Sequence, residues 1–185
     1  MEIFIVPYDK TTDIEVGFTK QKHYDKIWNK YNDIGKYVDE NIAKNHSEMQ
    51  QIIPYIILKN KDNKYFTAIL ENKDKKIMSI GFGNNIIPID GVYQPLFKGA
   101  VRTLLDDVDM EVLRPMKFVG TVRDMLTNKT QIGYVFLIDN VSNEIKLNNN
   151  NLKGSWKSKE ELIYDYKNLE SWSKHIVNFM VDNIL

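Results

Sequence analysis

The stretch "FKGAVRTLLDDVDM", residues 97–110, combines a helical hydrophobic pattern with two adjacent carboxylates. Its apolar residues recur at offsets of three, four and seven, which return to the same side of a helix. We expect that side to pack against a sheet; it consists of Phe97, Val101, Leu104, Leu105 and Val108. The other side then presents Thr103, Asp106, Asp107 and Met110.

Strand-like runs lie on both sides of this predicted helix. Upstream, the runs at 51–60, 65–72 and 76–83 are rich in β-branched and aromatic residues, and the turn-forming "KDN" joins the first two. Downstream, the runs at 116–125 and 131–141 have the same character. The pattern predicts a sheet with the helix in its middle connection.

The two ends of the chain add further elements. The opening "EIFIVPY" predicts a short strand, and residues 19–44 have the spacing of a helix. Near the other end, Ser158 and Glu161 have capping-box spacing ahead of a short helix. A last helix carries one apolar stripe, formed by Leu169, Trp172, Ile176, Phe179, Met180 and Ile184.

This order of elements predicts an α/β fold of the α+β sandwich kind, a mixed β-sheet with helices packed on its faces. A length of 185 residues suits one domain with its own core. We therefore expect a single domain over 1–185, in which 1–48 form an N-terminal strand and helix extension and 49–185 form the core.

Composition excludes several classes of function. The chain has no cysteine, which excludes disulfides, thiolate catalysis and thiolate metal sites. Its 25 basic and 25 acidic side chains balance, so we expect no general nucleic-acid binding. No apolar run is long enough for a membrane helix or a signal peptide. We expect a cytoplasmic protein that does not bind membranes.

The adjacent carboxylates Asp106 and Asp107 are the residues of chemical interest on the predicted helix. Carboxylate oxygens on a rigid element suit a hard cation such as magnesium and leave positions for phosphate oxygens. A solvated acidic helix face is the alternative. Against that alternative, negative charge near a helix C-terminus is disfavoured by the macrodipole.

At these residues the chain resembles the Nudix family, whose box reads G-x5-E-x7-R-E-U-x-E-E-x-G-U, where U is aliphatic. The matching positions are Arg102, Leu104, Asp106, Asp107 and Met110. Thr103 stands where the first helix Glu belongs, and Asp109 where Gly belongs. Gly83 would be the opening glycine but lies five residues too far from Arg102, while Gln94 occupies the strict position of the upstream Glu.

Segments outside the box extend the resemblance. "SIGFGNNIIPID" resembles the loop "IGIGGHINPxD" of a bacterial Nudix subgroup that has a long insert before its helix. "QQIIPYIILKN" resembles the first sheet strand of that subgroup, and "LKGSWKSKEELI" its closing segment. The likeness covers residues 49–185 and implies a Nudix-like sheet with helices on its faces.

The resemblance also implies roles for particular residues. Asp106 and Asp107 correspond to metal ligands, and Arg102 to an arginine that orients a box carboxylate, although an ion pair with Asp106 would also explain it. Asn84 and Asn85 replace a Gly-His pair and either contact ligand or satisfy the turn backbone. Arg123 either reaches a phosphate or forms a surface ion pair with Asp124.

Three functions follow from the resemblance. The first is a Nudix-fold protein with a degenerate metal site that binds a nucleotide or other diphosphate-linked ligand, holds Mg²⁺ or Mn²⁺ weakly, and hydrolyses poorly or not at all. The second is an active metal-dependent hydrolase that cleaves a nucleoside diphosphate linked to another moiety. It would use Asp106, Asp107 and a further acid from Glu71, Glu160 or Glu161. The third is a protein-interaction module. Whether the protein is an enzyme stays open, as does its oligomeric state, with a homodimer among the options.

Overall fold

The structure is a computed structural model that describes residues 1–185 except 22–23, 25–27, 30, 32, 72–74, 92, 111–114 and 125–130. Its elements, in chain order, are β1 (Glu2–Pro7), η1 (Tyr8–Lys10), β2 (Gly17–Lys20), β3 (Lys36–Asp39), α2 (Glu40–Asn45), β4 (Met49–Asn60), β5 (Tyr65–Glu71), β6 (Lys76–Ser79), β7 (Gly81–Gly83), η2 (Pro88–Asp90), α3 (Pro95–Asp107), β8 (Val108–Asp109), β9 (Met116–Arg123), β10 (Gln131–Val141), β11 (Lys146–Leu147), β12 (Leu152–Lys157), α4 (Lys159–Tyr164), η3 (Tyr166–Asn168) and α5 (Ser171–Asp182).

The described strands form a ten-stranded mixed sheet whose main path runs β12-β5-β4-β10-β9-β2. β4 and β10 are parallel, with Ile52 beside Ile132 and Leu58 beside Ile138. Both strands are covered on both faces, which explains why their sequences are nearly continuous apolar runs. The expected mixed sheet with helices on its faces is confirmed.

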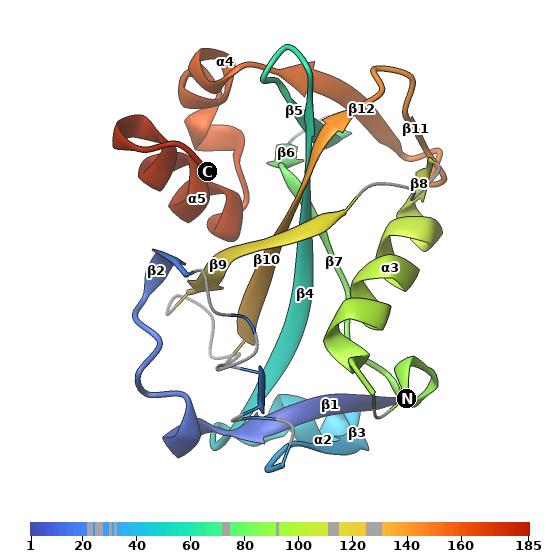
Figure 1. The fold of residues 1–185 in the computed structure, drawn as a ribbon, viewed down its shortest axis with the longest axis vertical. Coiled ribbons are helices and arrows are strands. Elements are labelled where there is room, and N and C mark those ends of the chain that lie inside the picture. The colour runs from blue at the N-terminus through green and yellow to red at the C-terminus, as the bar shows by residue number, and fades with distance from the viewer. Residues whose placement is uncertain are drawn as a thin grey trace.

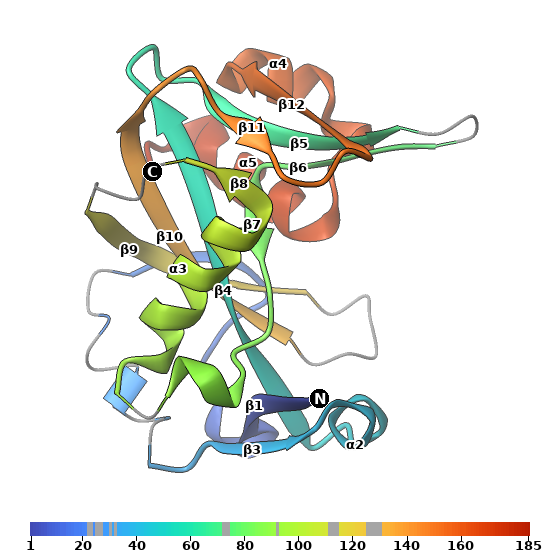
Figure 2. The same cartoon turned by 90° about the vertical axis from the view of Figure 1, so that its right-hand side faces the viewer.

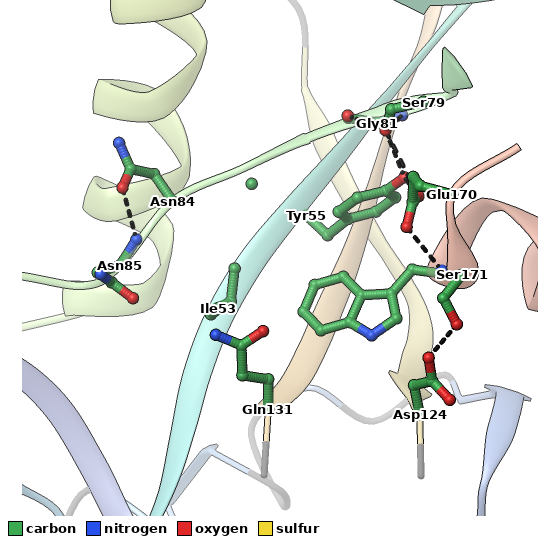
Figure 3. A pocket seen from close by; sticks show the side chains of 12 residues that line it. Ile53, Tyr55, Ser79, Gly81, Asn84, Asn85, Asp124, Gln131, Glu170 and Ser171 are labelled. Carbon is green, nitrogen blue, oxygen red and sulfur yellow. Dashed lines mark hydrogen bonds between the residues drawn. The ribbon is translucent and has the colours of Figure 1, made fainter. Parts of the chain in front are cut away.

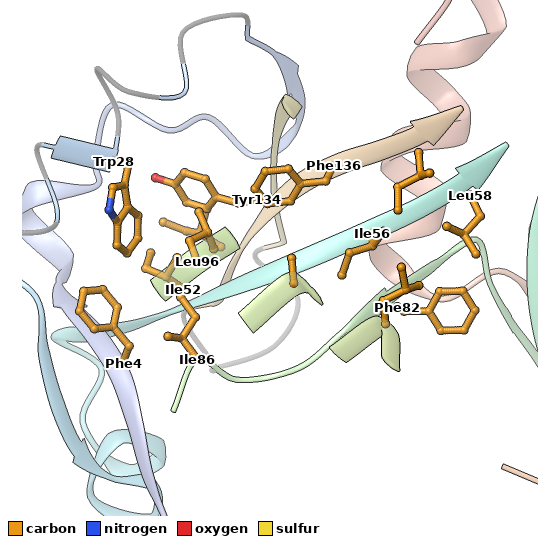
Figure 4. Packing of buried hydrophobic residues seen from close by; sticks show 14 of the residues in the cluster. Phe4, Trp28, Ile52, Ile56, Leu58, Phe82, Ile86, Leu96, Tyr134 and Phe136 are labelled. Carbon is orange, nitrogen blue, oxygen red and sulfur yellow. The ribbon is translucent and has the colours of Figure 1, made fainter. Parts of the chain in front are cut away.

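Side-chain alternation along β4 divides the core into two clusters. Ile52 and Ile56 belong to the cluster that also contains Leu104 of α3, shown in part in Figure 4. Tyr55 and Ile57 belong to the cluster that contains Ile176 of α5. Figure 1 shows α3 and α5 on opposite sides of these central strands.

The predicted helix at 97–108 is present as α3, but its buried face differs from the prediction. Leu104 and Val108 are buried as expected, whereas Phe97 is 39% and Leu105 53% exposed. Thr103, expected on the outer face, is fully buried. The prediction considered only large apolar residues, but the buried face of α3 also contains small ones. Its buried residues include Gly99, Ala100 and Thr103 beside Leu96 and Leu104.

Close packing against the preceding loop explains this rotation of the helix. A Cβ atom added at Gly99 would lie 3.1 Å from Oδ2 of Asp90, so the helix approaches η2 where it has no side chain. Figure 2 shows the loop before α3 alongside the first turns of that helix. Small residues therefore mark this contact, while Phe97 and Leu105 remain exposed.

The predicted helix over 19–44 is wrong at residues 19–20 and 36–39 and right at residues 40–44, which belong to α2. Residues 17–20 form β2, which pairs with β9, and residues 36–39 form β3, which pairs with β1. Pairing in the sheet, which is not visible in local spacing, determined both conformations. α2 begins only after Asp39, whose Oδ1 accepts a hydrogen bond from the backbone N–H of Asn41 at 2.9 Å. Residues 22–23, 25–27, 30 and 32 lie outside the described part.

Two strand predictions also need correction. The run at 76–83 divides at Ile80, so that β6 pairs with β5 while β7 pairs with β4. β12 was not predicted and pairs with β5, where Trp156 lies opposite Phe66. The runs at 51–60 and 131–141 are strands as expected, and those predicted at 65–72 and 116–125 are strands over Tyr65–Glu71 and Met116–Arg123.

The closing helices agree well with the sequence. Ser158 and Glu161 form the predicted capping box at the start of α4. α5 buries Ile176 and Met180, whereas Ile184 lies beyond its end and is 81% exposed. None of the described helices is long and apolar enough to cross a membrane.

Candidate functional site

A cavity of about 520 Å³ lies between the sheet and the start of α5. Figure 3 shows side chains from five parts of the chain around it. It is lined by Ile53 and Tyr55 from β4, Ser79, Gly81 and Gly83 from β6 and β7, Asn84 and Asn85 from the next loop, Asp124 directly after β9, Gln131 from β10, and Glu170, Ser171 and Trp172 at α5.

Trp172 forms one wall because β10 makes room for its ring. A Cβ atom added at Gly133 would lie 2.9 Å from Cζ3 of Trp172, which is too close for any side chain. The ring meets Tyr55 edge to face, with the centroids 5.5 Å apart at an angle of 78°. Gly133 thus lets an aromatic surface lie against the sheet.

Glu170 accepts the hydrogen bonds that hold one wall of the cavity together. Its Oε1 accepts hydrogen bonds from the Tyr55 hydroxyl at 2.8 Å and from the Ser173 N–H at 2.7 Å and hydroxyl at 2.6 Å. Its Oε2 accepts from the N–H of Trp172 at 2.8 Å. The carboxylate therefore caps α5 and fixes the position of Tyr55.

Tyr55 is a hydrogen-bond donor in this network. Burial, together with the nearby Glu170 carboxylate, raises the pKa of Tyr55 well above its usual value. The hydroxyls of Ser79 and Ser173 each lie 3.0 Å from its oxygen. The phenol stays protonated, so it contributes polarity without charge.

Asp124 and Gln131 form the opposite rim, at the ends of two neighbouring antiparallel strands. The hydroxyl of Ser171 donates to Oδ2 of Asp124, and Nε2 of His175 lies 3.8 Å from Oδ1. Nε2 of Gln131 donates to Oε1 of Gln51 at 2.6 Å. That bond orients the Gln131 amide, which Figure 3 shows near Ile53.

β7 and the loop after it border the cavity because two glycines of β7 let that strand run close to Tyr55. A Cβ atom at Gly81 would lie 2.2 Å from the Tyr55 ring, and one at Gly83 would lie 3.2 Å from it. Oδ1 of Asn84 accepts from the N–H of Asn85 at 2.8 Å. Asn84 and Asn85 thus line the cavity, and Asn84 also satisfies the turn backbone, so both suggested uses are compatible.

Arg102 connects this loop to α3. Its Nη2 donates to the carbonyl of Asn85 at 2.6 Å and to Oδ2 of Asp90 at 3.1 Å, while Nε donates to Oδ1 of Asp90 at 2.9 Å. Hydrogen bonding to Asp90 raises the pKa of Arg102 above its usual range. The expected ion pair with Asp106 is present at 3.5 Å and is the longer contact.

The carboxylates of α3 lie outside the cavity lining. Asp106 is 57% exposed at its side chain, and Asp107 is partly buried. Burial raises the pKa of Asp107, and the charge of Asp106 adds to this shift. These two residues share one end of the helix as predicted.

The residues present do not fit a three-carboxylate magnesium site. Thr103, at the position of the first helix Glu, is fully buried, and its hydroxyl has no hydrogen-bond partner among the described residues. Arg102 already supplies a cation beside Asp106. Within the described ranges, no group of three or more His, Cys, Asp or Glu residues could hold a metal ion.

Arg123 has a different environment from either one suggested by the sequence. It is 6% exposed, so it is not a surface residue, and it does not line the cavity. Its Nη1 donates to the carbonyls of Thr11 and Ile14 at 3.1 and 3.0 Å, and its guanidinium lies 5.0 Å from the centroid of the Tyr8 ring. These contacts attach the N-terminal segment to β9.

Two of the suggested further acids, Glu160 and Glu161, are also absent from the lining. Glu160 and Glu161 begin α4, where the Glu161 carboxylate accepts from the N–H of Ser158 at 2.7 Å. The side chain of Glu71 lies outside the described part. The acidic residues that do line the cavity, Asp124 and Glu170, were not singled out as ligand contacts by the sequence.

Sequence reasoning missed most of the cavity. Trp172 was expected to pack in the core, and Gln131 carried no signal beyond its place at the start of a strand. Asp90 lies within the quoted stretch "SIGFGNNIIPID", and its place after Pro88 was the only indication of its role.

Solved structures with the same architecture identify the fold of this chain. The crystal structure of Tm1382, provisionally described as a Nudix hydrolase, has a TM-score of 0.85 and 19% identity, and the match covers 98% of this chain and 99% of that one. The MutT protein from Methanosarcina mazei Go1 has a TM-score of 0.55 and 18% identity over 72% and 96% of the two chains. The E. coli dihydroneopterin triphosphate pyrophosphohydrolase has a TM-score of 0.51 and 11% identity over 72% and 96%.

These likenesses show that the chain has the fold of the Nudix hydrolases. The fold expected from the sequence resemblance is therefore confirmed. No family model and no curated protein matches the chain. At identities of 11 to 19% the likenesses concern the fold, so function has to be inferred from the site itself.

Proposed function

We propose that this Nudix-fold chain binds a nucleotide or another diphosphate-linked ligand and hydrolyses it weakly or not at all. The observation that carries the proposal is the cavity of about 520 Å³, whose loop at Asn84 and Asn85 is joined to α3 through Arg102. A cavity of this size suits a small organic ligand. The end of α3 supplies two short carboxylates, which favours binding over metal-dependent turnover.

Magnesium or manganese should bind the free protein only at millimolar concentrations. Two aspartates, one of them beside Arg102, are few ligands for an octahedral ion. Isothermal titration calorimetry with each metal tests this, and Asp106→Asn is the informative variant. A tight site that this variant abolishes would contradict the proposal.

A nucleotide panel tests the binding itself. Nucleoside diphosphates, nucleotide sugars and inorganic pyrophosphate are added with and without magnesium, and the thermal midpoint is followed with ligand concentration. A specific ligand of the folded state should raise the midpoint progressively. Product release is measured in the same samples. Binding without turnover supports the proposal, and absence of any stabilisation contradicts it.

An active hydrolase is the alternative suggested by the fold of the structural relatives. It would be favoured by rapid product release from the unmodified protein in the same assay. If Asp107→Asn then lowered this rate while ligand affinity stayed constant, the α3 carboxylates would be serving turnover. That result would replace the first proposal.

An interaction module is the other alternative, and the outer face of α3 favours it. Phe97 and Leu105 are exposed there, together with Tyr93 just before the helix at 72%. Apolar groups that gather on one surface often mark protein contacts. Light scattering of the unmodified protein and of Leu105→Ser would detect a homodimer formed through this face. Self-association together with no nucleotide binding would favour this reading.

A further inference from the structure

The cavity is lined by acidic side chains, and their charge limits which part of a ligand can bind inside it. Asp124 and Glu170 both line it, and none of the described lining residues is a lysine or an arginine. A diphosphate buried beside two carboxyl groups would meet like charge in a place of reduced dielectric. Phosphate groups are therefore disfavoured inside this cavity.

Hydrogen-bond acceptors are present on the side chains that line the cavity. The Gln131 amide lines the cavity, its Nε2 donates to Oε1 of Gln51 at 2.6 Å, and its own oxygen is an acceptor. Oε2 of Glu170 accepts one bond, from the Trp172 N–H, and a carboxylate oxygen can accept two. The walls thus call for N–H donors on the ligand.

Aromatic surface lies beside these acceptors. Trp172 lines the cavity and is held in place by its edge-to-face contact with Tyr55 and by the space above Gly133. A flat heterocycle such as a nucleobase can stack favourably against an indole ring. A planar group with N–H donors on its edge would satisfy both features.

We infer that this cavity binds an amino-bearing heterocycle through its N–H edge, with the phosphates outside toward Asn84, Asn85 and α3. The inference rests on the proposed function and specifies which half of the ligand occupies the cavity. Nucleobases with an exocyclic amino group, such as cytosine and guanine, fit this description. Uracil and hypoxanthine present a carbonyl oxygen or a bare carbon at the corresponding position.

Two matched pairs of nucleosides test the inference by calorimetry without any phosphate. Cytidine and uridine differ at the 4-amino group, and guanosine and inosine differ at the 2-amino group. At least one amino-bearing member should bind about tenfold or more tightly than its partner, because an acceptor left unpaired costs affinity. Inorganic pyrophosphate should not compete with the bound nucleoside.

Variants assign the preference to the cavity. Gln131→Met removes one acceptor and should reduce the preference by about tenfold or more. Asp124→Asn is a second variant in case the first unfolds, and circular dichroism checks both. Asp182→Asn is the control, because Asp182 is an exposed acidic residue at the end of α5, outside the cavity. It should leave the preference unchanged.

The outcomes separate this inference from the proposed function. Nucleotide binding with equal affinity for both members of each pair overturns the inference and leaves the proposed function intact. Competition by pyrophosphate alone, or a preference unchanged in both folded variants, also overturns it. If no nucleotide or nucleoside binds, the proposed function fails and the inference fails with it.

Discussion

Arg102 and Asp90 form a two-point ion pair, in which Nε donates to Oδ1 at 2.9 Å and Nη2 to Oδ2 at 3.1 Å. Asp90 is 3% exposed, and its Oδ2 also accepts from the N–H of Ile87 at 2.9 Å. The pair therefore fixes the loop after β7 against α3. Because the same arginine holds the carbonyl of Asn85, this contact also shapes one edge of the cavity.

Asp90→Asn should destabilise the protein by about 3 kcal/mol, since a partly buried arginine would lose its charged partner. Urea denaturation measures the change. Asp106→Asn is the matched control, because it removes the exposed carboxylate that pairs with the same arginine. It should lower the free energy of unfolding by less than about 1 kcal/mol. Equal losses in the two variants would show that Asp90 is not the dominant partner.

Thr103→Val should stabilise the protein by about 1 kcal/mol, because it removes a buried hydroxyl for which no partner is found in the described structure. Thr103→Glu should destabilise it strongly, because the fully buried position would have to accept a charge. Thermal or urea unfolding distinguishes these effects. A stable Thr103→Glu variant with improved magnesium affinity would contradict this prediction, because it would show that residue 103 lies on the same face as Asp106 and Asp107.

Asp107→Asn should increase stability near neutral pH. The pKa of Asp107 is raised in the folded state, so the folded protein binds more protons than the unfolded chain between the usual carboxyl range and the raised value. Through that window the stability of the unmodified protein falls as pH rises, and the penalty is complete above it. The gain from Asp107→Asn should therefore vanish in acid.

Thermal unfolding followed from acidic to neutral pH tests this sign. Asp109→Asn, at an exposed carboxylate two residues further on, is the control and should show little change at any pH. A gain for Asp107→Asn that grew toward acid would contradict the prediction.

Gly133→Ala should damage both stability and ligand binding. Its Cβ would lie 2.6 Å from Cγ1 of Val122 and 2.9 Å from Cζ3 of Trp172, so either the strand or the indole ring must move. Overpacking of this kind costs about 1–3 kcal/mol. Urea denaturation measures the loss of stability, and the nucleotide titration measures the change in ligand affinity. Normal affinity in the folded variant would show that Trp172 is not part of the binding surface.

The sequence by itself determined the strands at 51–60 and 131–141, the helix that became α3, and the capping box of Ser158 and Glu161. Each of these follows from local spacing of apolar residues or from a local hydrogen-bonding pattern, which neighbouring residues carry. The same local information identified the loop at Asn84 and Asn85 as a place of interest.

Only the tertiary structure decided which side of α3 is buried and which residues surround the cavity. Gly99 and Thr103 face inward because α3 packs against the loop that holds Asp90. Helical spacing alone does not show how closely a neighbouring segment will approach the helix. The cavity brings together β4, β9, β10 and the start of α5, which lie far apart in the chain. Contacts between distant segments depend on strand pairing and on the space left by residues such as Gly133, and these arise only when the chain has folded.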